Sequence, residues 1–382
     1  MFDLRSRGCR VAGAAALLAA AATARADYAL NMHQGVTPIS HEVYHLHMLI
    51  LYICCAIGVV VFGTMFYSII NHRKSKGAVA AQFHESTTVE IIWTIIPFVI
   101  LISMAIPATK TLLAMEDTRN ADVTIKVTGY QWKWGYDYLN DGVSSGAGPH
   151  IHFLSTLSTP KEEIYNHRAK GENYLLEVDH PLVVPVGRKV RLEITAADVI
   201  HSWWVPDLGM KKDAIPGYVN QMWLQVDKPG TYRGQCAELC GKDHGFMPIV
   251  VVAKNEADYE RWVHDRKRAL AGDAAAASKT WTRQALMAKG AKVYQANCAA
   301  CHQANGGGLP GTFPALNGSK VVNGPLAQHL QVVLKGRPGT AMQSFAGQLS
   351  DTEIAAVITY ERNSWDNHTG DLVQPAMVKA AR

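Results

Sequence analysis

The sequence predicts a multi-domain chain made of a two-helix transmembrane hairpin, an all-β domain and a small all-α domain. Three observations lead to this fold class. Two apolar runs, residues 46–70 and 91–115, are each 25 residues long, which exceeds the ~20 residues that a spanning helix needs. Short strand-like segments separated by turn residues follow them, and a helical pattern returns from Trp281.

Length and charge set the outer limits of this organisation. With 382 residues, the chain is long enough for two or three domains. The formal net charge is +5, and the 37 basic residues are scattered without a basic stripe. Nucleic-acid binding is therefore not expected.

A signal peptide is predicted at residues 1–26. Three arginines precede a short apolar run over residues 11–22, and an A-x-A cleavage motif ends at Ala26. This run is shorter than the ~20 residues needed to cross a bilayer. Export is therefore expected, and an uncleaved anchor is the alternative.

The membrane hairpin is expected over residues 27–120, with the two apolar runs as its spans. The segment between the spans carries three basic residues and a histidine within residues 72–76. Positive residues mark the cytoplasmic side of a membrane protein. Both outer ends of the hairpin are therefore predicted to face away from the cytoplasm.

The all-β domain is predicted over residues 121–254. Turn sequences such as Asp141-Gly142 and Pro185-Val186-Gly187 separate segments with the composition of short strands. The expected strands are residues 123–127, 175–178, 189–194, 222–226 and 249–252. This spacing indicates a β-sandwich or barrel.

The rest of the chain is expected to be largely helical. Residues 255–280 begin as a charged helix and then become an alanine-rich linker. A small all-α domain is predicted at residues 281–370, followed by a tail at residues 371–382. Within it, Ser350-Asp-Thr-Glu353 has the pattern of a capping box that opens a helix.

Sulfur and imidazole ligands are concentrated in one segment of the all-β domain. Cys236, Cys240, His244 and Met247 lie within twelve residues, and His201 precedes Cys236 by thirty-five. Sulfur ligands with imidazole suit copper or zinc, and a weak thioether favours copper. Two thiolates could bridge a pair of copper ions, whereas one would give a mononuclear site. A structural zinc and a Cys236–Cys240 disulfide are the alternatives.

A second cysteine pair belongs to Cys298-Ala-Ala-Cys301-His302, a C-x-x-C-H motif. In such a motif the two thiols attach a haem c, and the histidine is placed as an axial ligand. A redox dithiol is the alternative, but the exported, small and helical domain favours haem. Electron transfer needs a second axial ligand, usually methionine, for which Met287, Met342 and Met377 are candidates.

The first ligand cluster resembles the binuclear copper motif of cytochrome c oxidase subunit II. The residues that match this motif in type and spacing are His201, Cys236, Glu238, Cys240, His244 and Met247. The stretches His201-Ser-Trp-Trp-Val-Pro, Lys212-Asp-Ala-Ile-Pro-Gly217 and Gly129-Tyr-Gln-Trp132-Lys-Trp134 are also similar to that family. The resemblance implies a cupredoxin-like barrel that holds a binuclear copper (CuA) centre.

The resemblance also implies a role for each ligand. Cys236 and Cys240 bridge both copper ions. His201 and His244 each ligate one copper, and Met247 supplies a thioether.

Two further residues of the all-β domain receive roles from the resemblance. Glu238 supplies a backbone carbonyl to copper, and its carboxylate binds a magnesium or manganese ion shared with subunit I; a surface carboxylate is the alternative. Trp132 corresponds to the tryptophan at which electrons arrive, although clustered aromatic residues more often serve packing. Lys133 departs from the family, which often has an aromatic residue there.

The C-terminal domain resembles the class I cytochrome c domains that are fused to some oxidases. The stretches Leu349-Ser-Asp-Thr-Glu353 and Tyr360-Glu-Arg-Asn-Ser-Trp365 support this likeness. Met342, forty residues after His302, stands where these cytochromes carry their distal methionine. Gln343 follows it, where many of them have proline.

Glu90 precedes the second apolar run. Thr87-Thr-Val-Glu90 has the pattern of a capping box, and a carboxylate at a helix N-terminus also complements the helix dipole. In the family that the chain resembles, a glutamate at this position lies at the mouth of a proton channel into subunit I. Both a structural and a proton-uptake role are therefore open.

The resemblance implies an electron-transfer subunit of a haem–copper terminal oxidase. Electrons would pass from cytochrome c through haem c and the copper pair to subunit I, where oxygen is reduced to water with proton pumping. The expected partners are subunits I and III and cytochrome c. The expected location is the bacterial inner membrane, with the copper and haem domains on the periplasmic side.

Three other functions are weighed against this one. A stand-alone membrane-anchored electron carrier would need a single span, whereas the chain has two apolar runs. A relative of nitrous oxide reductase would share the copper motif but lack the hairpin. A quinol oxidase subunit would share the fold but lack both cysteine pairs.

Overall fold

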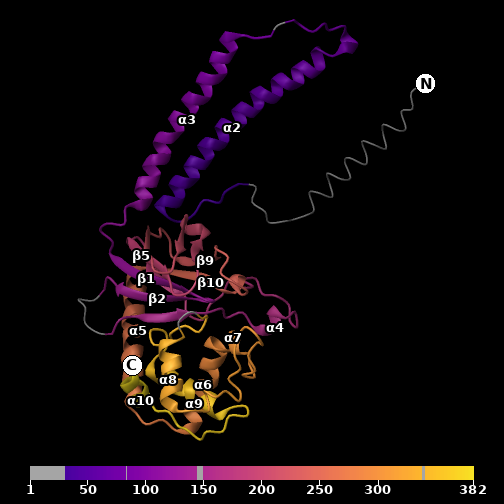
Figure 1. Ribbon diagram of the computed structural model, residues 1–382. Helices are drawn as coiled ribbons and strands as arrows, with labels where there is room; N and C mark the ends of the chain where they lie inside the picture. The colour runs from indigo at the N-terminus through magenta and orange to yellow at the C-terminus, as the bar shows by residue number, and fades with distance from the viewer. Residues whose placement is uncertain (1–30, 83, 144–148, 338–339) are drawn as a thin grey trace. The chain divides into compact units, whose positions relative to one another are not determined.

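The computed structural model describes residues 31–82, 84–143, 149–337 and 340–382. The predicted signal peptide at residues 1–26 lies outside these residues. Residues 35–382 form one unit, which contains every element named below (Figure 1).

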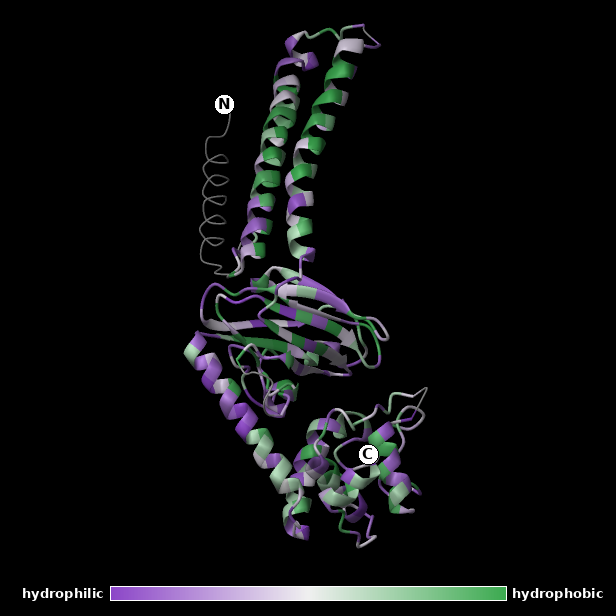
Figure 2. Cartoon of the chain, turned by 90° about the vertical axis from the view of Figure 1, so that its left-hand side faces the viewer, coloured by the Kyte–Doolittle hydropathy of each residue, from purple (hydrophilic) through white to green (hydrophobic). Residues whose placement is uncertain are grey.

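Two long helices form the hairpin. Helix α2 spans Pro38–Asn71, helix α3 spans Thr87–Glu116, and the short 3-10 helix η1, Lys74–Lys76, lies between them. Both helices are long and apolar enough to cross a membrane. Most of both helices is coloured as hydrophobic in Figure 2, and their large hydrophobic residues are largely exposed within the chain. Exposed apolar surface of this kind is suited to lipid.

The capping box predicted at Thr87 is wrong. The N-cap of α3 is Ser86, whose side chain caps nothing, and the Glu90 backbone N–H donates to the Ser86 carbonyl at 3.0 Å. Because α3 begins one residue earlier than expected, Glu90 stands at the fourth helical position. A capping box needs the acidic residue at the third.

In the part of the chain that the structure describes, ten strands form two five-stranded sheets. Their bounds are β1 Val123–Tyr130, β2 Lys133–Asn140, β3 His152–Ser155, β4 Leu182–Pro185, β5 Val190–Ala196, β6 His201–Val205, β7 Met210–Ala214, β8 Asn220–Leu224, β9 Gly230–Cys236 and β10 Pro248–Lys254. The sheet orders are β3-β2-β1-β5-β8 and β4-β10-β9-β6-β7. The β1–β5 and β10–β4 pairs are parallel, and the other pairs are antiparallel. One core of buried residues joins both sheets.

The predicted strands agree with the sheets at four of five places, and residues 175–178 are the exception. Leu175 lies in a turn with φ of 61°, and only Val178 makes an isolated bridge, to Leu157. A β-branched or bulky residue at positive φ does not continue a strand. Short helices α4, Lys161–Ile164, and η2, Pro206–Leu208, also lie in this domain.

Helix α5, Glu256–Ala277, follows the last strand. The alanine-rich stretch expected to become an irregular linker is helical as far as Ala277, in keeping with the high helix propensity of alanine. At the start of α5, Tyr259 and Val263 are fully buried in the core of the β domain.

The C-terminal domain contains helices α6, Arg283–Asn297, α7, Ala299–His302, α8, Leu326–Lys335, α9, Asp351–Asn363, and α10, Pro375–Ala381. Helices α6 and α9 are in direct contact at Gly290. A Cβ at this position would lie 2.1 Å from the Ala356 carbonyl oxygen, so only glycine allows this close approach. The capping box predicted at Ser350 and Glu353 is confirmed. The predicted fold class, a membrane hairpin followed by an all-β and an all-α domain, is confirmed.

Candidate functional site

Neighbouring strands bring the predicted ligands of the β domain together. His201 is the first residue of β6, and Cys236 is the last residue of β9, which pairs with β6. The chain then turns through Cys240 into the 3-10 helix η3, His244–Phe246, and reaches Met247 immediately before β10. Adjacent strands lie about 4.8 Å apart, so residues at these ends can share one site.

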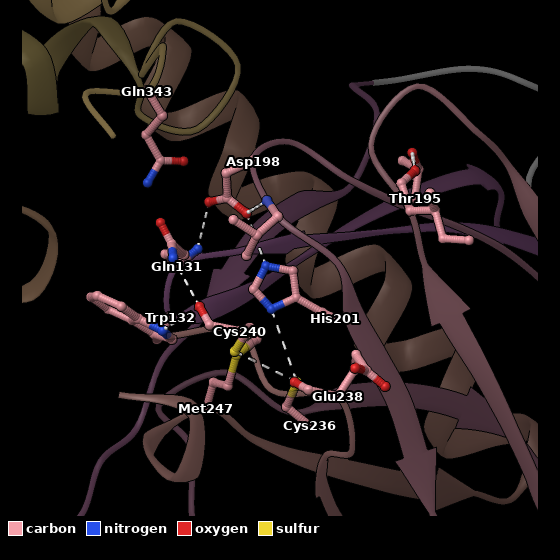
Figure 3. A network of polar contacts seen from close by, with 12 residues as sticks. Gln131, Trp132, Thr195, Asp198, His201, Cys236, Glu238, Cys240, Met247 and Gln343 are labelled. Carbon is pink, nitrogen blue, oxygen red and sulfur yellow. Dashed lines mark hydrogen bonds and ion pairs between the residues drawn. The ribbon is translucent and has the colours of Figure 1, made fainter. Parts of the chain in front are cut away.

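The five ligand side chains converge in the structure. Figure 3 shows four of them, from His201, Cys236, Cys240 and Met247. Cys236 Sγ lies 3.9 Å from Cys240 Sγ and 3.9 Å from His201 Nδ1. Cys240 Sγ in turn lies 3.5 Å from His244 Nδ1 and 3.5 Å from Met247 Sδ. Cys236, Cys240 and His201 are all buried and form a group able to hold a metal ion.

The distance between the two sulfurs separates the alternatives of a disulfide and a metal centre. A disulfide bond is about 2.05 Å long, whereas these sulfurs are 3.9 Å apart and both thiols are free. A metal–thiolate bond is about 2.3 Å long for zinc, which is more than half of the sulfur–sulfur distance. One metal ion could therefore contact both sulfurs from one side of the line that joins them, and a second ion could do so from the other side. The pair of sulfurs fits a bridged binuclear centre.

His201 is held in one orientation by Asp198. His201 Nε2 lies 2.9 Å from Asp198 Oδ1, which leaves Nδ1 directed at the sulfurs. The Asp198 carboxylate is itself fixed by the backbone N–H groups of Gln131 and Val199, each at 2.7 Å. A Cβ at position 129 would lie 2.7 Å from the His201 ring, so Gly129 leaves room for the imidazole.

The protonation of the cluster follows from these contacts. The hydrogen bond from Cys240 lowers the pKa of the Cys236 thiol to about 3, and the same shared proton raises the pKa of Cys240. Burial lowers the pKa of His201, but hydrogen bonds with Asp198 and Cys236 outweigh it and raise the pKa. Cys236 is therefore favoured as a thiolate, which is the form of cysteine that binds metals.

Glu238 contributes to the cluster through its backbone. Its carbonyl oxygen lies 3.3 Å from Cys236 Sγ, although the residue as a whole is exposed. The carbonyl and the carboxylate are therefore directed to different surroundings.

Trp132 and Gln131 are tied to the same loop. Trp132 Nε1–H and the Gln131 side-chain amide both donate to the Cys240 carbonyl oxygen, at 3.2 and 2.8 Å. Sequence reasoning missed Gln131 and Asp198. An acidic residue three positions before a candidate histidine ligand was the available signal for Asp198.

The C-x-x-C-H segment forms helix α7, with Cys298 directly before it. His302 is buried, and its Nδ1 lies 2.8 Å from the Pro314 carbonyl oxygen. This hydrogen bond leaves Nε2 as the free nitrogen, in the arrangement that orients a histidine ligand. Cys298 and Cys301 are free thiols, and burial raises the pKa of each. These donors fit a covalently attached haem.

The three methionine candidates differ in their surroundings. Met342 is half-buried and packs against the core of the C-terminal domain. Met287 lies within α6, and Met377 is 41% exposed in α10. Of the three, Met342 belongs to a loop, between α8 and α9, rather than to a helix.

Glu90 lies apart from both clusters. It is exposed in the first turn of α3, and the rest of that helix separates it from the β domain by roughly 40 Å at 1.5 Å per residue. The hairpin places this carboxylate at the end of α3 that is distant from the metal ligands.

Comparison with known families gives matches for three segments of the chain. Residues 25–111 match the family described as cytochrome c oxidase subunit II, transmembrane domain, and residues 123–254 match its periplasmic domain. Residues 285–360 match the family described as cytochrome c oxidase, cbb3-type, subunit III.

Two relatives and one solved structure are similar to part of the chain. A probable cytochrome c oxidase subunit 2 of Rickettsia bellii is 40% identical over 63% of this chain and 86% of its own length. Cytochrome c oxidase subunit 2 of Cereibacter sphaeroides is 34% identical over 68% of this chain and 91% of its own length. The periplasmic domain of cytochrome oxidase subunit II from Bradyrhizobium japonicum is 39% identical, covers 40% of this chain and 97% of that structure, and has a TM-score of 0.34.

Proposed function

Because the chain belongs to the cytochrome c oxidase subunit II family, we propose that it carries electrons from a cytochrome c donor to subunit I of a haem–copper terminal oxidase, through a haem c and a binuclear copper centre. The observation that carries this proposal is the convergence of two imidazoles and a thioether on a pair of thiol sulfurs that lie 3.9 Å apart. Oxygen reduction to water, with proton pumping, would take place in subunit I.

The residues that would hold copper are those of the cluster. Cys236 and Cys240 would each contribute a thiolate, His201 and His244 an imidazole Nδ1, and Met247 a thioether. Bound here, copper and haem would supply one-electron oxidation and reduction. Four of the five ligands are shielded from water, because His201, Cys236, Cys240 and Met247 are each at most 3% exposed, and His244 is half-buried. Rigid, buried ligands limit the rearrangement that accompanies a change of charge.

The residues that would hold the haem are Cys298, Cys301 and His302, with Met342 as the distal ligand. The Pro314 carbonyl keeps the His302 ring oriented. Methionine in the second axial position raises the reduction potential of a haem, which suits a carrier that feeds an oxidase.

Three further roles belong to the same proposal. Glu238 would hold magnesium or manganese shared with subunit I through its carboxylate, because the residue is exposed and contacts the copper cluster through its backbone carbonyl. Trp132 is the position at which electrons reach the copper domain, since its indole bonds to the carbonyl of the copper ligand Cys240. Glu90 takes up protons at the distant end of α3.

The setting of the chain follows from the hairpin. We place it in the bacterial inner membrane through α2 and α3, with both metal domains on the periplasmic side. Subunit I, subunit III and cytochrome c are its proposed partners.

Optical and EPR spectra of the purified full-length chain test the function. We expect a low-spin haem c band together with a mixed-valence copper signal. Cys236→Ser should abolish the copper signal and retain the haem band, whereas Cys298→Ser should do the reverse. Cys54→Ser in α2 is the matched control and should change neither. A chain that lacks either signal would remove that half of the proposal.

A further inference from the structure

Helix α6 ends at the haem-attachment segment without a cation of its own. Its last turn contains no basic residue. The C-terminal end of a helix carries partial negative charge on its carbonyl groups, and a nearby cation stabilises it. This end of α6 is therefore suited to receive cations from another part of the protein.

Three lysines of the copper domain supply such cations. They come from separate segments, α4, the start of β2 and the copper loop, and their acceptors lie within six residues of one another. The contacts, each 3.1 Å long, are Lys161 Nζ to Gln295 Oε1, Lys133 Nζ to Asn297 Oδ1, and Lys242 Nζ to the Ala300 carbonyl oxygen.

The contact between the copper domain and the cytochrome domain excludes water at Lys133. Its side chain is buried, with the residue 4% exposed, and Nζ also lies 5.2 Å from the centre of the Phe345 ring. Burial of an ammonium group is costly unless it finds partners. The amide and the ring that receive this ammonium both belong to the cytochrome domain.

Lys242 connects the two cofactor segments directly. It lies two residues after Cys240 in the copper loop, and it donates to Ala300 within the C-x-x-C-H segment. Its Nζ also lies 5.7 Å from the centre of the Trp132 ring, whose indole donates to Cys240. One ammonium group therefore touches the haem-attachment backbone and faces the aromatic ring beside the copper ligands.

We propose that residues 295–302 form a docking surface for the copper domain of the same chain, with Lys133, Lys161 and Lys242 as its positioning residues. The occupant of this surface is the chain's own copper domain, because all three donor lysines belong to that domain and all three acceptors lie within residues 295–302. The inference rests on the proposed function only in assigning haem and copper to the two segments.

Zero-length cross-linking tests this surface on the full-length chain with its cofactors bound. Gln295→Glu places a carboxylate opposite Lys161, and a carbodiimide joins the two only if they are in contact. Gln284→Glu is the matched control, because it lies at the other end of the same exposed helix face. A double variant, Gln295→Glu with Lys161→Arg, keeps the charge but removes the reactive amine.

We expect a cross-linked peptide between positions 161 and 295 that is at least about tenfold more abundant than any link formed at position 284, since docking raises the effective concentration of the partners to the millimolar range. The double variant should lose it. Asn297→Asp should give a second link, to Lys133.

Absence of both links would overturn the docking surface, as would equal linking at position 284. The haem and copper spectra of the same samples keep the two proposals apart. Normal spectra without cross-links would leave the proposed function standing, and missing spectra would remove that function whatever the cross-links show.

Discussion

Asp198 and His201 are joined by a 2.9 Å contact that leaves the other imidazole nitrogen, Nδ1, facing Cys236. The same carboxylate is anchored by two backbone N–H groups, so it can hold the ring without moving itself. The orientation of one metal ligand is thus set by a residue that touches no sulfur.

Asp198→Ala should weaken copper binding by about 10- to 100-fold, the usual effect of removing a residue that orients a metal ligand. Asp198→Asn keeps an oxygen acceptor and should lose much less. A competitive copper titration followed by the mixed-valence EPR signal measures both. Asp258→Ala in α5 is the control, since its partner is the surface residue Arg261. Equal affinities for the Ala and Asn variants would contradict the role of the acceptor.

The candidate metal ligands were easier to predict from the sequence than the residues that hold them in place. Two cysteines, a histidine and a methionine within twelve residues favoured a metal centre over a disulfide. Asp198 and Gln131 are common polar residues, and only the pairing of β6 with β9 and the turn after β1 bring them to the cluster.

The fold was predictable where the pattern is local. The apolar runs of α2 and α3 and the capping box at Ser350 need no knowledge of the rest of the chain. Leu175 was misplaced because its apolar neighbours suggest a strand, while tertiary structure holds it at positive φ. The contact of Lys133 with the cytochrome domain joins residues 164 positions apart, a separation that no sequence pattern encodes.

Met342→Ala should remove the distal ligand and leave the haem attached. We expect a change from a six-coordinate low-spin spectrum to a weaker-field one, and a lower reduction potential, because methionine ligation raises it. Redox titration of the optical spectrum measures both effects. Met287→Leu and Met377→Leu test the other two candidates and should change neither. A spectral change in either control with none in Met342→Ala would assign the ligand elsewhere.

Glu90→Gln should slow proton uptake in the assembled oxidase by about tenfold or more, because an amide cannot relay a proton as a carboxyl group does. Flow-flash measurement of proton uptake in a single turnover, with steady-state turnover, checks this. Glu116→Gln, at the other end of α3, is the matched control. Unchanged uptake and turnover in Glu90→Gln would reduce its role to that of an acidic residue near a helix N-terminus.

The buried ammonium of Lys133 should make the stability of the chain depend on pH. Burial lowers the pKa of Lys133 to about 8, against an ordinary value of 10.5. Below pH 8 the group is charged in both the folded and the unfolded chain, so folding bears the full cost of burying the charge, roughly 3 kcal/mol for this shift. As pH rises from 8 to 10.5, the folded chain loses its proton first, and this cost disappears.

Lys133→Met should therefore raise the melting temperature at pH 7, and the difference from the unsubstituted chain should shrink steadily towards pH 10.5. Thermal unfolding of both proteins across this range, followed by the haem absorption, measures the difference. Asn297→Asp provides the complementary variant. A carboxylate beside the ammonium should return the pKa of Lys133 towards 10.5 and flatten the same profile. A difference between Lys133→Met and the unsubstituted chain that stays constant with pH would show that the ammonium is not buried against the cytochrome domain.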